Sequence, residues 1–513
     1  MDAVILPTLP RPVAGAPLES LPQEILYQIF EDLAFDDLAR LSRCSKSLRP
    51  RLLLAMLAYK EPCRHNRQQE VSVPPLTVAI YTRMPERVKA AIAEGALVDP
   101  GYLTRPATSP SHEEARPLYE KPWYVPVCAA ARCIGKSAGL AEQDRSVLEI
   151  MSLCLEHGGD INLNVPIGRK EIRFTTPLLM FLDALDGRAW AGAAAGADAS
   201  ASALITSLKY LLDHGADPLE PSHPSLFDSL VFEDPLGRYN EEPTEEEPWW
   251  FPADPPADML LGRWGVEHLA NPAFALAIKM LLTHPSVSAD RAARTLARAC
   301  AQPGARALTA EWQGLVDALI EHFAAAGKLD ELLYVFVVRT GTCPMLDNTV
   351  SCYNGCRHEV GDGARATVRL LLGAGADVNW MWPDDQVDWT HNHEQHEFKG
   401  PYVDEEEAYG PTALHVICQW INRRTWSHHP TVLTESPVEI RKYVIGKERL
   451  GFVRFLLEEC GADPDLLFER HNVPFHFSSG LYHNGYDEDR EQDGKALLEL
   501  LEKHCLSPGP AKK

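Results

Sequence analysis

A run of apolar residues at helical spacing, closed by Gly and a small residue, occurs five times in this 513-residue chain. In four copies an Asp follows, as in LLDHGAD at 211–217. Gly adopts the left-handed conformation at a helix end at little cost, and the Asp side chain can close a local turn. Short helices that repeat in this way cannot bury their apolar faces alone, so they must stack on one another. The copies are 88–96, 151–162, 208–218, 368–379 and 453–464.

Shorter apolar segments, each begun by Pro or containing it, precede several of these runs at 75–80, 176–180, 411–417 and 473–477. This order, with Thr-Pro-Leu or Pro-Thr-Ala-Leu-His before the first helix and Gly-Ala-Asp after the second, resembles ankyrin repeats. Periodicity adds helix pairs near 271–289, 291–327 and 330–379. We therefore expect an array over 73–506 with about eight repeats, where the roughly 33-residue ankyrin period would allow about thirteen.

Long insertions explain the difference in repeat number. Two of them, 100–121 and 380–409, follow a Gly turn, and three others cover 183–203, 235–268 and 421–449. Exposed Trp side chains often anchor protein interfaces, so insertion tryptophans are candidate target-binding residues. The alternative is that these rings fold back onto the array as a satellite core. The candidates are Trp249, Trp250, Trp380, Trp382 and Trp389.

The N-terminal segment SLPQEILYQIF at 20–30 predicts a helix with an unusually wide apolar face. Ser20 and Gln23 have capping-box spacing, and Pro22 suits a first helical turn. The apolar arc from Ile25 to Leu33 covers about 140°, more than the roughly 100° of an ordinary surface helix. A second helix is predicted from Asp36-Asp37, and a third is predicted to open or continue at Leu52. Domains of this size usually need a metal, disulfides or a partner to be stable.

Residues 18–60 resemble an F-box, a family whose helices dock onto the adaptor subunit of an SCF-type ubiquitin ligase. The segment departs from the family pattern at Leu48-Arg49, where an aromatic residue is often found. The resemblance implies that seven residues supply adaptor contacts or the packing beneath them: Leu21, Pro22, Ile25, Ile29, Leu33, Leu38 and Leu41. An amphipathic helical hairpin packed on the next domain is the alternative.

Composition limits the compartment and the partners. No apolar run approaches the roughly 18 residues of a membrane span, and the N-terminus does not read as a signal peptide, so we expect a cytoplasmic or nuclear protein. Twelve cysteines in 513 residues are too few for a disulfide framework. The net charge of −23 disfavours nucleic acid and anionic membranes as partners. It resides entirely in residues 61–513, because the first sixty carry seven acidic and seven basic side chains.

Two clusters could in principle hold a metal, namely Cys343, Cys352, Cys356 and His358, and then His391, His393 and His396. Neither has paired C-x2-C spacing, so we predict no metal and no cofactor. No nucleophile elbow, P-loop or H-E-x-x-H motif is present, and Gly135-Lys136-Ser137 lacks the earlier Gly of a Walker motif. The chain is therefore expected to be non-catalytic.

These features predict an all-α protein in which a three-helix F-box precedes an ankyrin-repeat solenoid, with flexible tails at 1–17 and 507–513. By resemblance to F-box/ankyrin proteins, the expected function is the substrate receptor of an SCF-type E3 ligase, with adaptor and cullin bound through the F-box and a target protein bound through the array. The first alternative is an ankyrin scaffold without a role in ubiquitylation. The second is a metalloprotein that uses the loop from Cys343 to His358.

Overall fold

The structure is a computed structural model that describes most helices and short strands of the chain. The described residues form two compact units, one within 1–192, 197–216 and 221–253, the other within 193–196, 217–220 and 254–513. Each unit is considered by itself below. The described residues are 18, 21–45, 47–62, 70–98, 124–138, 145–167, 171–185, 198–219, 249–250, 255–301, 309–341, 360–383, 409–414, 417–418, 447–464, 496–497 and 499–504.

Three helices open the first unit: α1 (Gln23–Glu31), α2 (Phe35–Cys44) and α3 (Arg49–Ala58). The predicted start of α1 at Ser20 is wrong, because Pro22 occupies the N-cap position and its carbonyl accepts from the Leu26 N–H at 3.1 Å. The extended backbone of Pro22 supplies the first helical acceptor, so a side-chain cap is not needed there. In α2, Asp36 and Asp37 lie in the first turn, where the helix dipole favours negative charge.

Helix pairs follow in the first unit, and proline begins most of their helices. Pro is the first residue of α4, α5, α7 and α9, where its missing N–H costs no hydrogen bond. Helix α4 packs against α5 and α7 against α8, while α7 also lies between α4 and α9. Helix α7 was not predicted. The bounds are α4 (Pro75–Tyr81), α5 (Pro85–Ala93), α7 (Pro126–Ser137), α8 (Arg145–Glu156), α9 (Pro177–Asp183) and α11 (Asp198–Asp213).

Helices α7 and α9 approach each other closely at Gly135. A Cβ at this position would collide with the carbonyl oxygen of Phe181. The glycine of the Gly135-Lys136-Ser137 segment therefore serves helix packing, and the segment lies inside a helix, as expected of a chance resemblance to a Walker motif.

The described strands are only two to five residues long, so the fold is mostly helical as predicted. In the first unit β1 (Lys60–Pro62) and β2 (Glu70–Ser72) form an antiparallel pair. Strand β4 (Glu171–Thr175) pairs antiparallel with β3 (Val165–Ile167) and parallel with β5 (Trp249–Trp250). In the second unit β6 (Met381–Pro383) pairs antiparallel with β7 (Tyr409–Thr412).

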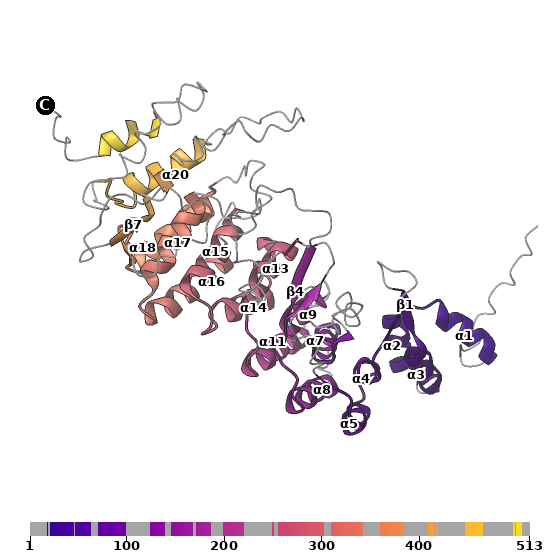
Figure 1. Ribbon diagram of the computed structural model, residues 1–513. Coiled ribbons are helices and arrows are strands. Elements are labelled where there is room, and N and C mark those ends of the chain that lie inside the picture. The colour runs from indigo at the N-terminus through magenta and orange to yellow at the C-terminus, as the bar shows by residue number, and fades with distance from the viewer. Residues whose placement is uncertain are drawn as a thin grey trace, which may run out of the picture. The chain divides into compact units, whose positions relative to one another are not determined.

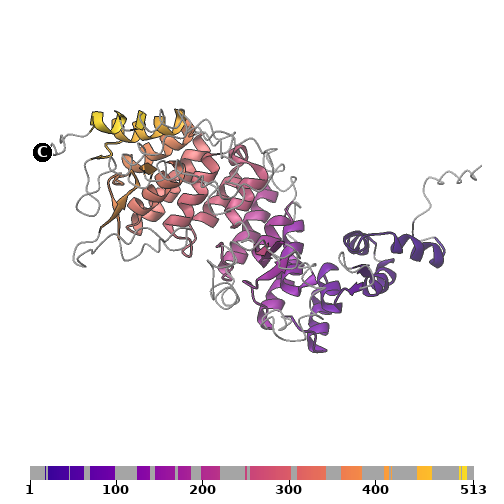
Figure 2. The same ribbon diagram turned by 45° about the horizontal axis from the view of Figure 1, so that its top comes forward.

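In the second unit the helices stand in two rows (Figures 1 and 2). Helices α13, α15 and α17 pack one on the next, and α14, α16 and α18 do the same beside them. Side chains of Asn271, Ser288 and Thr309 cap α14, α15 and α16 by accepting backbone N–H groups. The bounds are α13 (Pro256–Trp264), η4 (Val266–Ala270), α14 (Pro272–Leu282), α15 (Ala289–Cys300), α16 (Ala310–Ala325), α17 (Leu329–Gly341), α18 (Asp362–Gly373) and α20 (Lys447–Glu458).

Two predicted boundaries in this unit need correction. The insertion was predicted to extend over 235–268, but its last part, from residue 256 on, forms α13 and most of η4. The segment 271–289 was predicted as a helix pair, whereas it holds α14 and only the first residue of α15, and α14 packs on α13. The predicted pairs at 291–327 and 330–379 match α15 with α16 and α17 with α18.

All five predicted Gly turns are confirmed. Each glycine has a positive φ, between 73° and 98°. In two copies an Asn after the turn Asp binds the next turn: Asn162 Nδ2 donates to the Gly215 carbonyl at 2.8 Å, and Asn379 Nδ2 to the Gly461 carbonyl at 3.1 Å. Successive turns therefore lie side by side. The glycines are Gly95, Gly158, Gly215, Gly375 and Gly461.

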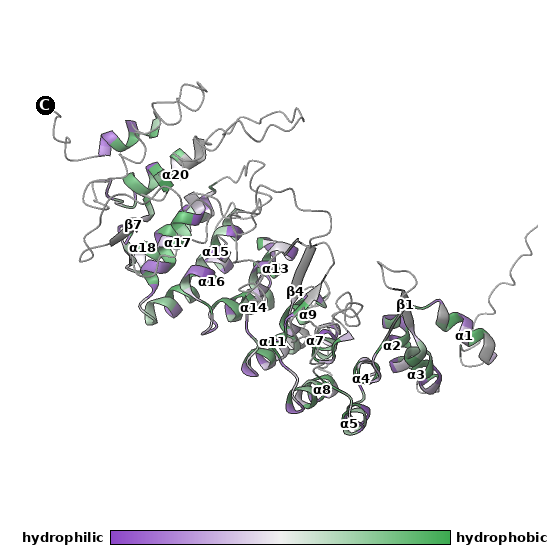
Figure 3. Ribbon diagram, in the orientation of Figure 1, coloured by the Kyte–Doolittle hydropathy of each residue, from purple (hydrophilic) through white to green (hydrophobic). Residues whose placement is uncertain are grey.

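The first helices of the pairs are buried almost all the way round. Most residues of α7, α9 and α17 are buried, and Figure 3 shows α17 as mainly hydrophobic. In the first unit, Leu163 and Val165 of the β3 segment pack with Cys128 and Met180. A helix with apolar residues on all sides belongs to a core.

Candidate functional site

The N-terminal helices expose apolar side chains. Among the described residues, five large hydrophobic side chains are exposed, and three of them belong to α1 and α3. Ile25 is 42% exposed, Leu54 59% and Leu57 45%. Of the other two, Leu97 lies in the first unit after α5, and Leu276 lies in the second unit. Exposed apolar residues gathered in one small domain indicate an interaction surface.

The predicted adaptor contacts divide between surface and core. Pro22 and Ile25 are exposed, and Leu38 is fully buried. Leu38 therefore belongs to the packing beneath the surface. In α1, Leu26 and Phe30 are also buried. The remaining predicted contacts are half-buried: Leu21, Ile29, Leu33 and Leu41.

Leu54 and Leu57 were absent from the predicted contacts. Helix α3 buries Leu52, Leu53 and Met56 and presents Leu54 and Leu57 to solvent. The run of apolar residues from 52 to 57 covers the whole circumference of this helix, which is the sequence signal that identifies them.

An aromatic cluster joins the N-terminal helices to the first helix pairs. The Phe35 ring at the start of α2 lies 5.2 Å from Tyr81 and 5.9 Å from Tyr124, both nearly edge-on, and 5.6 Å from Tyr59. Phe35, Tyr81 and Tyr124 are buried. Edge-to-face ring pairs each add about 0.5–1.5 kcal/mol beyond burial. The N-terminal helices are thus packed firmly onto α4.

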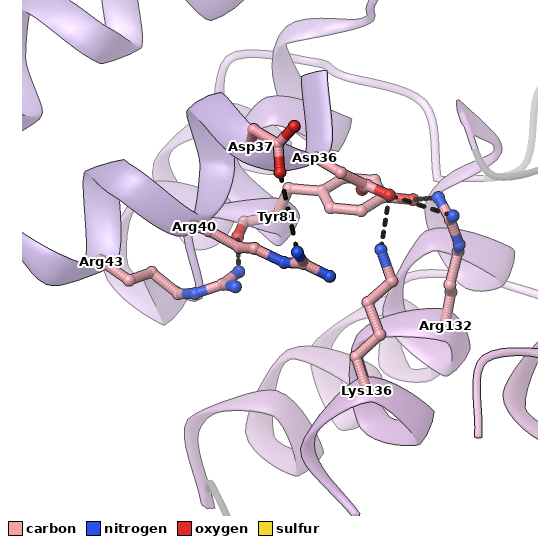
Figure 4. Close-up of polar contacts among 7 residues, drawn as sticks. All are labelled: Asp36, Asp37, Arg40, Arg43, Tyr81, Arg132 and Lys136. Atoms are coloured by element: carbon pink, nitrogen blue, oxygen red, sulfur yellow. Dashed lines mark hydrogen bonds and ion pairs between the residues drawn. The ribbon is translucent and has the colours of Figure 1, made fainter. Parts of the chain in front are cut away.

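Asp36 forms a polar junction with α7 beside this cluster (Figure 4). Its Oδ2 accepts from Lys136 Nζ at 2.6 Å and from Arg132 Nη2 at 3.1 Å. Arg132 also donates to the Tyr81 hydroxyl at 3.1 Å, and Arg43 donates to the Tyr81 carbonyl at 3.1 Å. One carboxylate and one tyrosine therefore connect α2, α4 and α7.

The pKa values at this junction reflect two cations that share one carboxylate. Burial raises the pKa of Asp36, but the hydrogen bond from Lys136 and the charges of Arg132 and Lys136 outweigh it, and the pKa lies below 3.8. The pKa of Lys136 is also lowered, because burial and repulsion by Arg132 exceed its attraction to Asp36. Both cations stabilise the ionised form of the carboxylate, whereas each cation destabilises the charged form of the other.

The tryptophan candidates are only partly described. Trp380 is half-buried, and its ring lies 5.6 Å from Tyr334 of α17 at a steep angle, which favours the satellite-core alternative for this residue. Trp249 and Trp250 form β5, and Trp382 belongs to β6. Trp389 lies outside the described residues.

The two sequence clusters considered as metal ligands, from Cys343 to His358 and from His391 to His396, also lie outside the described residues. Among the residues that are described, no group of three or more His, Cys, Asp or Glu is arranged to hold a metal ion. Cys154 and Cys418 are buried, as expected of reduced thiols in apolar helices. Burial raises the pKa of both Cys154 and Cys300 to about 12, so these thiols stay protonated and are poor nucleophiles.

Among the described residues, no helix is both long enough and apolar enough to span a membrane.

Comparison with known proteins identifies one region of the chain. No curated protein and no solved structure matches it. Residues 18–51 match the family described as F-box-like. This segment covers α1, α2 and the beginning of α3, which are the helices that carry Ile25 and the buried Leu26, Phe30 and Leu38. The N-terminal helices therefore form an F-box-like domain.

Proposed function

We propose that this chain is the substrate-recognition subunit of an SCF-type E3 ubiquitin ligase. In this proposal the F-box-like domain binds the adaptor and, through it, the cullin. The exposed Ile25, Leu54 and Leu57 carry the argument, because this small domain leaves large apolar side chains uncovered that a partner would bury. The chain itself would carry out no covalent chemistry.

The stacked helix pairs would serve as the target-binding part, and we propose that they are divergent ankyrin repeats. The positive-φ glycines at the turns and the Asn162 to Gly215 hydrogen bond between successive turns support this assignment. The junction at Asp36 would hold the array on the adaptor-binding domain. A bound target would then stay close to the ligase, which raises the effective concentration of its lysines.

Adaptor capture by purified full-length chain tests the proposal. Ile25→Glu places a charge in the proposed interface and is expected to weaken adaptor binding at least tenfold, a typical loss for an interface anchor. Leu276→Glu is the matched control, since both side chains are 42% exposed and Leu276 lies outside the F-box-like domain. Equal adaptor binding by the two variants, or no binding by the wild-type chain, would contradict the proposal.

A second candidate is a scaffold in which the F-box-like helices only cap the helix array. The packing of Phe35 onto Tyr81 and Tyr124 favours this possibility, because a terminal cap requires such contacts. The same experiment separates the candidates. A scaffold would not retain the adaptor, and Ile25→Glu would leave its other interactions intact.

A further inference from the structure

Charge is separated along the F-box-like domain. Residues 19–37, which include α1 and the start of α2, carry six acidic side chains and no basic one. Residues 38–60, which include the rest of α2 and all of α3, carry six basic side chains and no acidic one. The two segments cancel in the net charge of the domain. The basic segment nevertheless stands out in a chain whose net charge is −23.

Carboxylates offset little of the positive charge of this basic segment. Among its four arginines, only Arg40 has a carboxylate partner in the described part of the chain, an exposed ion pair with Asp37 at 3.6 Å. Arg43 and Arg49 each donate to a backbone carbonyl instead, at 3.1 Å and 2.9 Å. Carbonyl oxygens are neutral, so these contacts orient the guanidinium groups without cancelling their charge.

Arg51 lies beside the exposed apolar side chains of α3. On a helix with 3.6 residues per turn, Arg51, Leu54, Leu57 and Ala58 fall within an arc of about 120°, opposite the buried residues of this helix. Leu54, Leu57 and Ala58 are exposed, and Arg51 is half-buried. We call these four residues the α3 stripe. Within the part of the chain that the structure describes, the Arg51 side chain has no hydrogen bond and no ion pair.

The stability of α3 does not favour arginine at this position. Arg51 lies in the first turn of the helix, which carries no acidic residue. The helix dipole favours negative charge in a first turn and disfavours positive charge. The first turn of α2 follows this preference with Asp36 and Asp37. Selection for the stability of α3 alone would place an acidic or neutral residue at 51, so the cation there points to a role in binding.

We propose that the partner covering the α3 stripe presents carboxylate groups to Arg51. A partner that buries Leu54 and Leu57 must also remove water from Arg51, because the three side chains share one face of the helix. A desolvated guanidinium without an anion is costly, and a carboxylate can accept two parallel hydrogen bonds from it. The inference rests on the proposed function, in which this partner is the SCF adaptor. It adds the chemistry of the adaptor edge that meets α3, where Leu54 and Leu57 lie beyond the family match that ends at residue 51.

Association of the purified adaptor with the full-length chain, followed by biolayer interferometry, tests the inference. Arg51→Glu reverses the charge and is expected to lower the association rate constant by roughly threefold or more, because charges at the edge of an interface act mainly on association. Arg87→Glu is the matched control, since Arg87 lies on α5 of the same unit, is exposed and likewise has no side-chain ion pair among the described residues. Both variants change the net charge equally, so the difference between them reports on the site. Rising salt concentration should reduce that difference.

Thermal unfolding separates an effect on binding from an effect on folding. Glu at residue 51 suits the helix dipole, so Arg51→Glu should unfold at the same or a higher temperature than the wild-type chain. Equal association rates of Arg51→Glu and Arg87→Glu would overturn the inference, while the proposed function would stand if Ile25→Glu still weakened adaptor binding. Faster association of Arg51→Glu than of Arg87→Glu would show that the facing edge is cationic, which also overturns the inference. A wild-type chain that does not bind the adaptor would contradict the proposed function, and the inference with it.

Discussion

Asp36 in the first unit and Asp258 in the second each hold two cations that lie on one neighbouring helix, but their surroundings differ. The Asp36 side chain is 31% exposed and binds Arg132 and Lys136 of α7. The Asp258 side chain is 4% exposed and binds Arg291 at 3.1 Å and Arg298 at 2.5 Å, both from α15. The same arrangement thus lies at a partly solvated junction in the first unit and in a buried core in the second. Burial, more than the number of ion pairs, should determine the energetic effect of each carboxylate.

Loss of the buried carboxylate should have the largest effect. Asp258→Asn leaves the guanidinium groups of Arg291 and Arg298, each 12% exposed, without their shared anion. We expect the free energy of unfolding of the second unit to fall by about 3–5 kcal/mol, measured by urea denaturation. A loss below about 1 kcal/mol would show that burial does not distinguish the two carboxylates.

Two glycines, each in a buried helix of one unit, allow a second comparison of the two units. A Cβ at Gly135 of α7 meets the Phe181 backbone, whereas a Cβ at Gly341 of α17 meets only side-chain atoms of Ile417. Backbone cannot move aside as a side chain can, so Gly135→Ala should destabilise by about 2–3 kcal/mol and Gly341→Ala by less than about 1 kcal/mol. Thermal denaturation of both variants tests this order, and a reversed order would contradict it.

Asp36→Asn should have a smaller effect than Asp258→Asn. We expect a loss of about 1–2 kcal/mol, since solvent already screens the Asp36 junction and can hydrate Arg132 and Lys136 after the change. The loss should shrink as salt concentration rises, whereas the loss from Asp258→Asn should be nearly independent of salt. Urea denaturation at low and high NaCl provides the measurement.

The pH dependence of Asp36 should be the smallest effect. Because its folded-state pKa lies below 3.8, the ion pairs stabilise the fold fully above 3.8 and lose their effect as the pH falls through that lower value. The stability difference between wild type and Asp36→Asn should therefore be constant at neutral pH and narrow below pH 3.8. A difference that grows on acidification would show that the pKa shift has the opposite sign.

Local sequence signals predicted part of the fold well. The five Gly turns were predictable because positive φ is a property of the residue itself, confirmed at Gly95 and at Gly461. Helix α13 was taken for an insertion because Pro255 and Pro256 resemble a loop, although Pro256 is the first residue of the helix. Helix α7 carries no Gly-Ala-Asp ending, so the repeat pattern did not reveal it.

In the candidate site, the sequence could predict only which apolar residues lie on an exposed helix face. The apolar arc of α1 indicated Ile25, and the same reasoning applied to the apolar run of α3 would have indicated Leu57. The partners of Asp36 are about a hundred residues away, Arg132 and Lys136 on α7, and no local pattern links them.

The burial of α7 and α17 on every side limits where new binding specificity can evolve or be engineered. Randomising these helices would disrupt the core, since ten of the twelve residues of α7 and ten of the thirteen of α17 are buried. Variation that the fold can tolerate is confined, within the described residues, to the solvent-facing positions of helices such as α5 and α16 and to the turns between pairs. Libraries that aim to give this chain a new binding function should diversify those positions.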